Sequence, residues 1–205
     1  ATSSSAPLVI ANIWNQALAE CEQVLHIPMS SGLSSSCEIA MALAREENYA
    51  GRVWVVDIGR VATPMHRSVL DALELLAQGK TAAEVQHILQ QHRADMTIYV
   101  VVDELKHLAH GGRISNTTAA LGSILNMKPV LQFDVGKLNI HNKCRGKKRA
   151  RHIMIEALRA DLQGKFKQQW ESGRVHIVAA GSADKAETED WLAQIAEAFP
   201  GQPIM

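Results

Sequence analysis

The sequence lacks a net charge and has few aromatic side chains. Its 205 residues include 21 basic and 21 acidic side chains, and only 4% are aromatic. Basic residues are absent altogether before Arg45. A chain without net charge has no long-range attraction for phosphate groups, and few rings are present to stack on bases. We therefore do not expect wholesale binding to nucleic acid or to an anionic membrane surface.

Cysteine and long apolar runs are also scarce. The three cysteines, Cys21, Cys37 and Cys144, lie far apart and form no CxxC spacing. An odd number without a framework favours a reducing compartment. No apolar run approaches the roughly 20 residues that a membrane helix needs. We therefore expect a cytoplasmic protein without an integral membrane segment.

The first half of the sequence alternates helical and strand patterns. Pro7 can begin a helix, and the Ser/Thr-x-x-Glu sequences at 35–38 and 81–84 are typical of capping boxes. The apolar runs are short and continuous, as in strands buried on both faces of a parallel sheet. The order αβαβααβ predicts an α/β fold with a doubly wound parallel sheet. We expect helices over about 7–22, 36–47, 65–78 and 81–92, and strands over 24–28, 53–58 and 97–102.

The pattern changes after Gly111 and Gly112. Val135–Gly136 separates two strand-like runs and predicts a β-hairpin. We therefore expect a doubly wound α/β domain at 1–110, without its opening strand, and a smaller α+β domain at 111–205. The second domain is expected to contain strands 130–134, 137–143 and 175–180, and helices 147–163 and 185–198, with Trp191 and Ile195 on the apolar face of the last helix.

A serine-rich segment, Met29–Ser36, follows one predicted strand and precedes a helix. Ligands of open α/β sheets bind at this edge, where the strands end. A helix start also presents free N–H groups that favour an anion, and Ser30, Ser31 and Ser34 add hydroxyls. The segment is either an anion-binding loop or an ordinary serine-rich helix cap. A serine nucleophile is less expected, because the GxSxG elbow is absent.

Arg113 follows the paired glycines, and residues 114–127 after it carry no charge. A guanidinium group can hold a carboxylate with two parallel hydrogen bonds. A cation beside a long uncharged run suits a ligand with an anionic head and an apolar body. The alternative is a helix–helix turn with a surface arginine.

Six of the nine residues in 143–151 are basic. The run fits a solvated helix start, a docking surface for an acidic protein, or a nucleic-acid contact. Few aromatic residues lie near it, which weakens the nucleic-acid interpretation. His107 and His110 have helical spacing for a metal, but no third ligand is evident. Cys37 lies beside a helix start, and we expect it to be a buried structural residue.

Together these segments resemble the DegV family of bacterial fatty-acid-binding proteins. The resemblance extends over nearly the whole chain, and the motifs occur in the order of the family. Its most specific part is the glycine–arginine segment with the residues that follow it. The matching segments are Thr2–Pro7 (TSSSAP), Ser30–Ser34 (SSGLS), Val55–Asp57 (VVD), Gly111–Ser115 (GGRIS) with Leu121–Ser123 and Lys128–Leu131, and Lys143–Ala150 (KCRGKKRA).

This resemblance implies two α/β domains with a long-chain fatty acid between them. The acyl chain is expected in an apolar tunnel, which the uncharged run after Arg113 would help to line. The carboxylate is expected to contact Thr2 and either Ser31 or Ser34, with Arg113 in support. The family pattern also has a closing His…GPG segment, and we expect the second domain to lack it.

The resemblance further implies a lipid-binding carrier subunit and no catalytic residue, cofactor or metal of its own. A partner kinase would phosphorylate the presented carboxylate, and the acyl phosphate would enter phospholipid synthesis. Arg145, Lys147 and Lys148 are the expected docking residues. The absence of a phosphate-binding P-loop motif agrees with this division of labour. The alternative is a serine-dependent hydrolase of acyl esters that uses the loop at 30–36.

Overall fold

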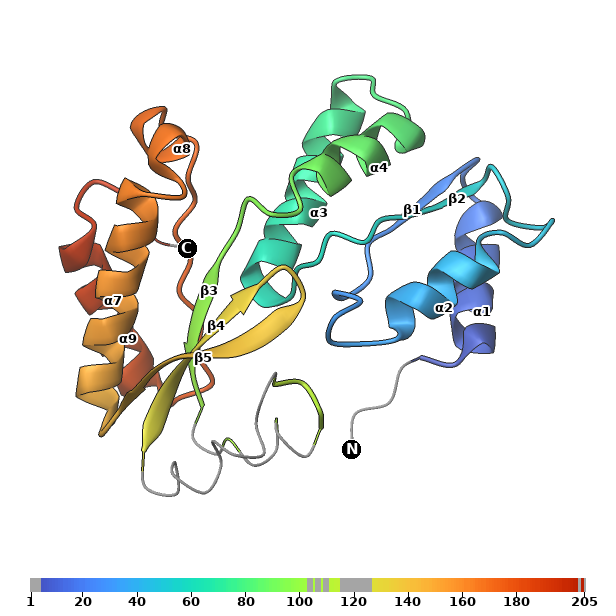
Figure 1. The fold of residues 1–205 in the computed structure, drawn as a ribbon. Helices are drawn as coiled ribbons and strands as arrows, with labels where there is room; N and C mark the ends of the chain where they lie inside the picture. The colour runs from blue at the N-terminus through green and yellow to red at the C-terminus, as the bar shows by residue number, and fades with distance from the viewer. Residues whose placement is uncertain are drawn as a thin grey trace. The chain divides into compact units, whose positions relative to one another are not determined.

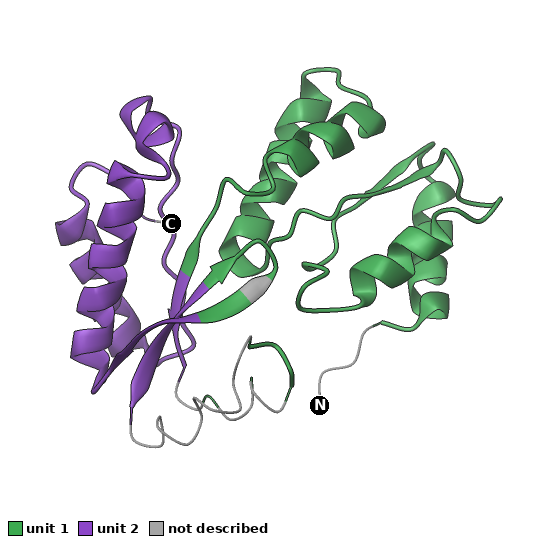
Figure 2. Ribbon diagram, viewed as in Figure 1, with its two compact units in different colours: residues 1–98, 104–117, 133–139 green, residues 99–103, 118–132, 140–205 purple. Residues whose placement is uncertain are grey.

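The chain forms two compact units, which Figure 2 colours separately. The domain boundary expected between residues 110 and 111 stays a prediction. Unit 1 comprises residues 1–98, 104–117 and 133–139, and unit 2 comprises residues 99–103, 118–132 and 140–205. The computed structural model describes residues 5–102, 105, 108, 111–114, 127–202 and 204.

Unit 1 contains a parallel pair of strands with helices on both faces. Val24 pairs with Val53 and His26 with Val55. One core cluster joins the first two helices to Val53 and Val55, and another joins the next two helices to residues 56–58. This arrangement confirms the predicted α/β class. The elements are α1 (Pro7–Leu18), β1 (Val24–His26), α2 (Ser36–Leu43), β2 (Val53–Val55), α3 (Ala62–Ala77) and α4 (Ala82–Gln91) (Figure 1).

Of the two capping boxes predicted from the sequence, one is present and the other is not. The capping box of α4 is confirmed, because Thr81 Oγ1 accepts from Glu84 N at 3.3 Å while Glu84 Oε2 accepts from Thr81 N at 2.8 Å. The box predicted at 35–38 is wrong. Ser35 has helical backbone angles and no side-chain cap bond. The hydroxyl of Ser34 accepts from Ser36 N at 3.2 Å instead.

The second sheet has the strand order β3–β4–β5, with β3 at Ile98–Val101, β4 at Lys128–Asp134 and β5 at Lys137–Cys144. The predicted hairpin is confirmed. Its two turn residues, Val135 and Gly136, have φ values of 38° and 84°, as a type I′ turn requires. The strand predicted at 97–102 hydrogen-bonds to β4 rather than to β1 or β2, so it belongs to this sheet.

Unit 2 also contains the helices α7 (Lys147–Gln163), α8 (Lys167–Glu171) and α9 (Lys185–Ala198). Trp191 and Ile195 of α9 lie in the core, as predicted. The strand predicted at 175–180 is wrong, since among the described residues of this run only Ile177 forms a bridge, to Ile204. An apolar run becomes a strand only where a neighbouring strand accepts its ladder of hydrogen bonds.

Candidate functional site

The loops that follow β1 and β2 meet at the carboxyl ends of the two strands. Residues 29–35, called the serine loop below, lie against residues 56–60. Ser30 is fully buried, and its N–H donates to Arg60 O at 2.9 Å. Ser31 Oγ donates to Asp57 Oδ2 at 2.7 Å. Two loops far apart in the sequence are thereby fixed at the edge where open α/β sheets bind ligands.

The turn of the β4–β5 hairpin approaches the serine loop closely. A Cβ atom added to Gly32 would lie only 1.8 Å from Gly136 O. A Cβ atom on Gly136 would lie 3.0 Å from Ser30 Oγ, and Gly136 already requires a positive φ of 84°. Both glycines therefore permit a backbone approach that any other residue would prevent.

A cavity of about 380 Å³ opens beside this approach, within the size range of small-ligand pockets, roughly 300–1,000 Å³. Two guanidinium groups and a serine face it, so its chemistry suits an anionic group. Ile114 and Val135 supply the apolar part of the wall. The cavity is lined by Ser31, Gly32, Arg93, Gly112, Arg113, Ile114, Val135 and Gly136.

Arg113 ties the paired glycines to the serine loop. Its Nε donates to Leu33 O at 3.2 Å, and its Nη1 donates to Gly111 O. The guanidinium is thus oriented by two backbone carbonyls, and Nη2 makes no hydrogen bond within the described chain. Ser31 and Arg113, predicted from separate motifs, therefore line the same cavity.

Arg93 also lines the cavity, and sequence reasoning missed it. It follows the last turn of α4, and its Nη2 lies 3.2 Å from Asp57 Oδ2. The same carboxylate accepts from Gly59 N at 3.1 Å through Oδ1. A charged residue just after a helix is common, so no signal in the sequence marked Arg93 out.

The other predicted ligand residues are placed differently. Ser34 does not line the cavity, and its Oγ lies 2.9 Å from Ser36 Oγ. Thr2 lies outside the described residues, as do His107, His110 and the uncharged run at 115–126.

Four further expectations can be compared with the structure. Burial, together with the negative charge of Asp57, raises the pKa of the Cys37 thiol to about 11, as befits a structural cysteine. No histidine hydrogen-bonds to a serine of the serine loop in the described residues, so the hydrolase alternative gains no support from a paired base. Across those residues, no group of three metal-ligating side chains occurs, and no helix is long and apolar enough to cross a bilayer.

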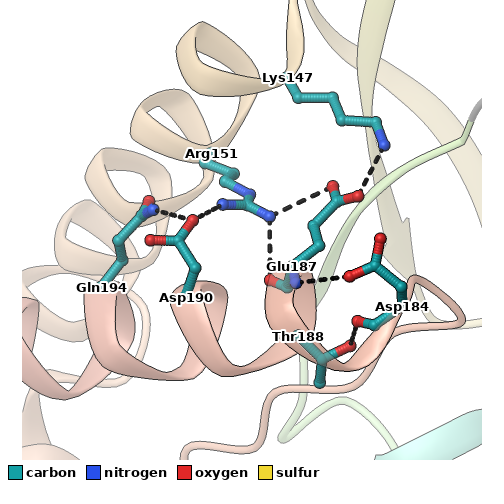
Figure 3. A network of polar contacts seen from close by, with 7 residues as sticks. All are labelled: Lys147, Arg151, Asp184, Glu187, Thr188, Asp190 and Gln194. Atoms are coloured by element: carbon teal, nitrogen blue, oxygen red, sulfur yellow. Dashed lines mark hydrogen bonds and ion pairs between the residues drawn. The ribbon is translucent and has the colours of Figure 1, made fainter.

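The basic run at 143–151 contains side chains that form ion pairs and others that form none with the described residues. Figure 3 shows Arg151 between two acidic residues of α9, with Nη1 at 2.6 Å from Asp190 Oδ2 and Nη2 at 3.3 Å from Glu187 Oε1. Lys147 Nζ lies 3.0 Å from Glu187 Oε2. Arg145 and Lys148 are exposed and form no ion pair among the described residues. The positive charge of these two faces solvent.

The chain is similar in sequence to proteins of the DegV family. The family model described as "Uncharacterised protein, DegV family" matches residues 1–205. A DegV domain-containing protein of Deinococcus radiodurans is 30% identical over 196 residues, which cover 95% of this chain and 67% of that protein. One from Streptococcus pyogenes is 31% identical over 167 residues, covering 80% of this chain and 56% of that protein. The chain therefore spans between about half and two thirds of these relatives.

Solved structures show the same fold. A DegV family protein from Thermus thermophilus, described by its fatty acid binding, is 31% identical with a TM-score of 0.75, covering 98% of this chain and 68% of that one. A stearic acid-binding protein from Eubacterium ventriosum has a TM-score of 0.84 at 16% identity, with the same two coverages, 98% and 68%. The second likeness concerns the fold alone.

Proposed function

This chain belongs to the DegV family, and from that premise we propose that it binds a long-chain fatty acid. The carboxylate occupies the unit 1 cavity, which Ser31, Arg93 and Arg113 help to line. That cavity is the observation that carries the proposal. The fatty-acid-binding relative from Thermus thermophilus, at 31% identity, supports the choice of ligand.

The chemistry of the cavity suits the head of such a ligand. A carboxylate removed from water needs hydrogen-bond donors around it, and guanidinium groups supply them in a planar fork. Arg113 is the assigned donor here, Ser31 lines the same cavity, and Thr2 and Ser34 join them by the family resemblance. Ile114 and Val135 offer an apolar wall on which the first methylenes of the acyl chain can lie.

Affinity should then rise with chain length. Each buried methylene contributes about 0.8 kcal/mol, so two methylenes change the dissociation constant by roughly 15-fold until the site is full. Lipid extracted from the purified protein, with titration of saturated acids of 12 to 18 carbons, tests the proposal. Recovery of no lipid, together with no binding of any added acid, would exclude it.

We further propose that the bound carboxylate is presented to a partner kinase, which transfers a phosphoryl group from ATP and forms an acyl phosphate. Arg145 and Lys148 are the docking residues, because both are exposed and unpaired within the described chain. Lys147, the third residue assigned to docking, shares its charge with Glu187. An acidic patch on the kinase would complement this surface.

Charge reversal at Arg145 and Lys148 tests the docking surface. Acyl phosphate formation by a fatty acid kinase subunit should fall, while affinity for the fatty acid stays unchanged. The control is Arg174→Glu, at an exposed arginine of unit 2 that forms no ion pair among the described residues. Equal kinase activity in the double variant and the control would remove the docking assignment and leave fatty acid binding intact.

A further inference from the structure

Arg93 has more hydrogen-bonding capacity than the protein uses. A guanidinium carries five N–H donors, and among the described residues this one has a single polar side-chain partner, the carboxylate of Asp57 at 3.2 Å. Its Nε is buried and has no hydrogen-bond partner among the described residues. The side chain is 35% exposed and lines the cavity beside Ser31 and Arg113. A partly desolvated cation with spare donors beside a cavity can take an anionic partner there.

The Ser31 hydroxyl does not donate a hydrogen bond to that anion while it donates to Asp57. Its hydroxyl hydrogen is directed to Asp57 Oδ2 at 2.7 Å, because a carboxylate only accepts. The lone pairs of Ser31 are left for the cavity. Among the described side chains that line the cavity, the donors for a ligand carboxylate are therefore those of the two arginines. Two guanidinium charges and the one negative charge of Asp57 leave a single positive charge, which matches one carboxylate.

Gly59 makes the position of Arg93 possible. The arginine side chain lies across the backbone at Gly59, where an added Cβ would be 2.4 Å from Nε and 3.0 Å from Cγ. Gly59 also has a φ of 60°, and its N–H donates to Asp57 Oδ1 at 3.1 Å. Asp57 thus holds the turn, the arginine and Ser31 together.

From these contacts we infer that Arg93 is a second ligand-binding arginine, which contacts the carboxylate of the fatty acid. Asp57 positions its guanidinium group, and the lack of a side chain at Gly59 leaves the space that it occupies. The inference rests on the proposed function and adds the residue that selects the charged head. It makes Arg93 a recognition group for the anion rather than a structural ion pair.

The test compares a fatty acid with its methyl ester, which has the same chain and no charge. Arg93→Gln should weaken binding of the acid by roughly 10- to 100-fold, as expected for a hydrogen bond between charged groups, and leave the ester unchanged. Arg93→Lys keeps the charge and should recover part of the loss. Arg45→Gln, at an exposed arginine outside the cavity, is the control and should change neither affinity.

Gly59→Ala should reproduce the effect of Arg93→Gln, because the new Cβ displaces the guanidinium. The double variant should lose no more than either single variant. Gly51→Ala is the matched control: Gly51 has a similar positive φ of 74°, but nothing lies within 4 Å of its added Cβ. It should lose stability and keep its affinity for the acid.

The outcomes separate the inference from the proposed function. If the wild type binds the acid and Arg93→Gln keeps the same preference for acid over ester, Arg93 is structural and the inference is wrong, while the function stands. Additive losses in the double variant would also overturn the link through Gly59. If the wild type binds neither ligand, the proposed function fails and the inference fails with it.

Discussion

Replacement of Gly32 by alanine should destabilise unit 1, because the serine loop and the hairpin turn approach each other through bare backbone. The added Cβ would lie 1.8 Å from Gly136 O and 2.5 Å from Gly136 C. Real Cβ atoms keep 3.0 Å or more from such atoms, so the two loops must separate by roughly 1.2 Å. Neither partner is the flexible end of a side chain that could rotate away.

The cost can be bounded from this displacement. Overpacking of a well-packed site costs about 1–3 kcal/mol, and more where backbone has to move. For a chain of about 200 residues, each kcal/mol lowers the melting temperature by about 2–4 °C. We therefore expect a drop of about 2–12 °C, and a weaker affinity for fatty acid because Ser31 and Gly136 lie on walls of the same cavity.

Thermal and urea unfolding of the variant measure this effect. Gly181→Ala is the matched control, since Gly181 is exposed and the nearest atom to its added Cβ is 4.0 Å away. That control should be neutral or slightly stabilising. A melting temperature for Gly32→Ala equal to that of the control would refute the close approach of the two loops.

The remaining predictions concern local features. Val135→Asn should raise the urea midpoint of unfolding by an amount equivalent to about 1 kcal/mol. A β-branched residue with a φ of 38° is strained, whereas asparagine tolerates that region. An unchanged midpoint would contradict this. Thr81→Ala should cost about 1 kcal/mol at neutral pH through loss of the cap. Hydrogen bonds from Thr81 hold the pKa of Glu84 below its ordinary 4.5, so the share of the stabilisation that comes from the Glu84 carboxylate is present above pH 4.5 and is lost as the pH falls through the lowered value. A cost in unfolding titrations that persists in full at low pH would contradict the assignment. In the native state, a thiol reagent at pH 8 should label exposed Cys21 and spare the two buried cysteines, Cys144 and Cys37, of which Cys37 has a pKa of about 11. Mass analysis after Cys21→Ser should then show no rapid labelling.

Features set by neighbours in the sequence could be predicted. The capping box of α4, the hairpin around Val135–Gly136 and the helix at 147–163 depend on contacts within a few residues. The box at 35–38 failed for a local reason too: three successive serines compete for one helix start, and Ser34 provides the cap bond rather than Ser35. Composition could not rank these hydroxyls, since each can reach a free N–H of the first turn.

Features set by distant parts of the chain could not be predicted. Asp57 and Arg93 lie 36 positions apart, and only the folded unit brings them within 3.2 Å. Position 113 was found because an arginine beside paired glycines is conspicuous. Arg93 has ordinary neighbours in the sequence, so its role depends wholly on the loop that it crosses.

The glycines of the site explain why its geometry is difficult to predict from the sequence. Gly32, Gly59 and Gly136 each stand where a Cβ would meet the backbone or a side chain of another loop at 3.0 Å or less. Gly32 has no positive φ to require glycine, so its identity is set by the approach of the hairpin turn alone. Gly59 serves both a turn and an arginine. The loops of the site can approach one another only because these three positions carry no side chain. Substitutions that add a single methyl group there should therefore lower stability and ligand affinity more than the loss of a hydroxyl from the serine loop.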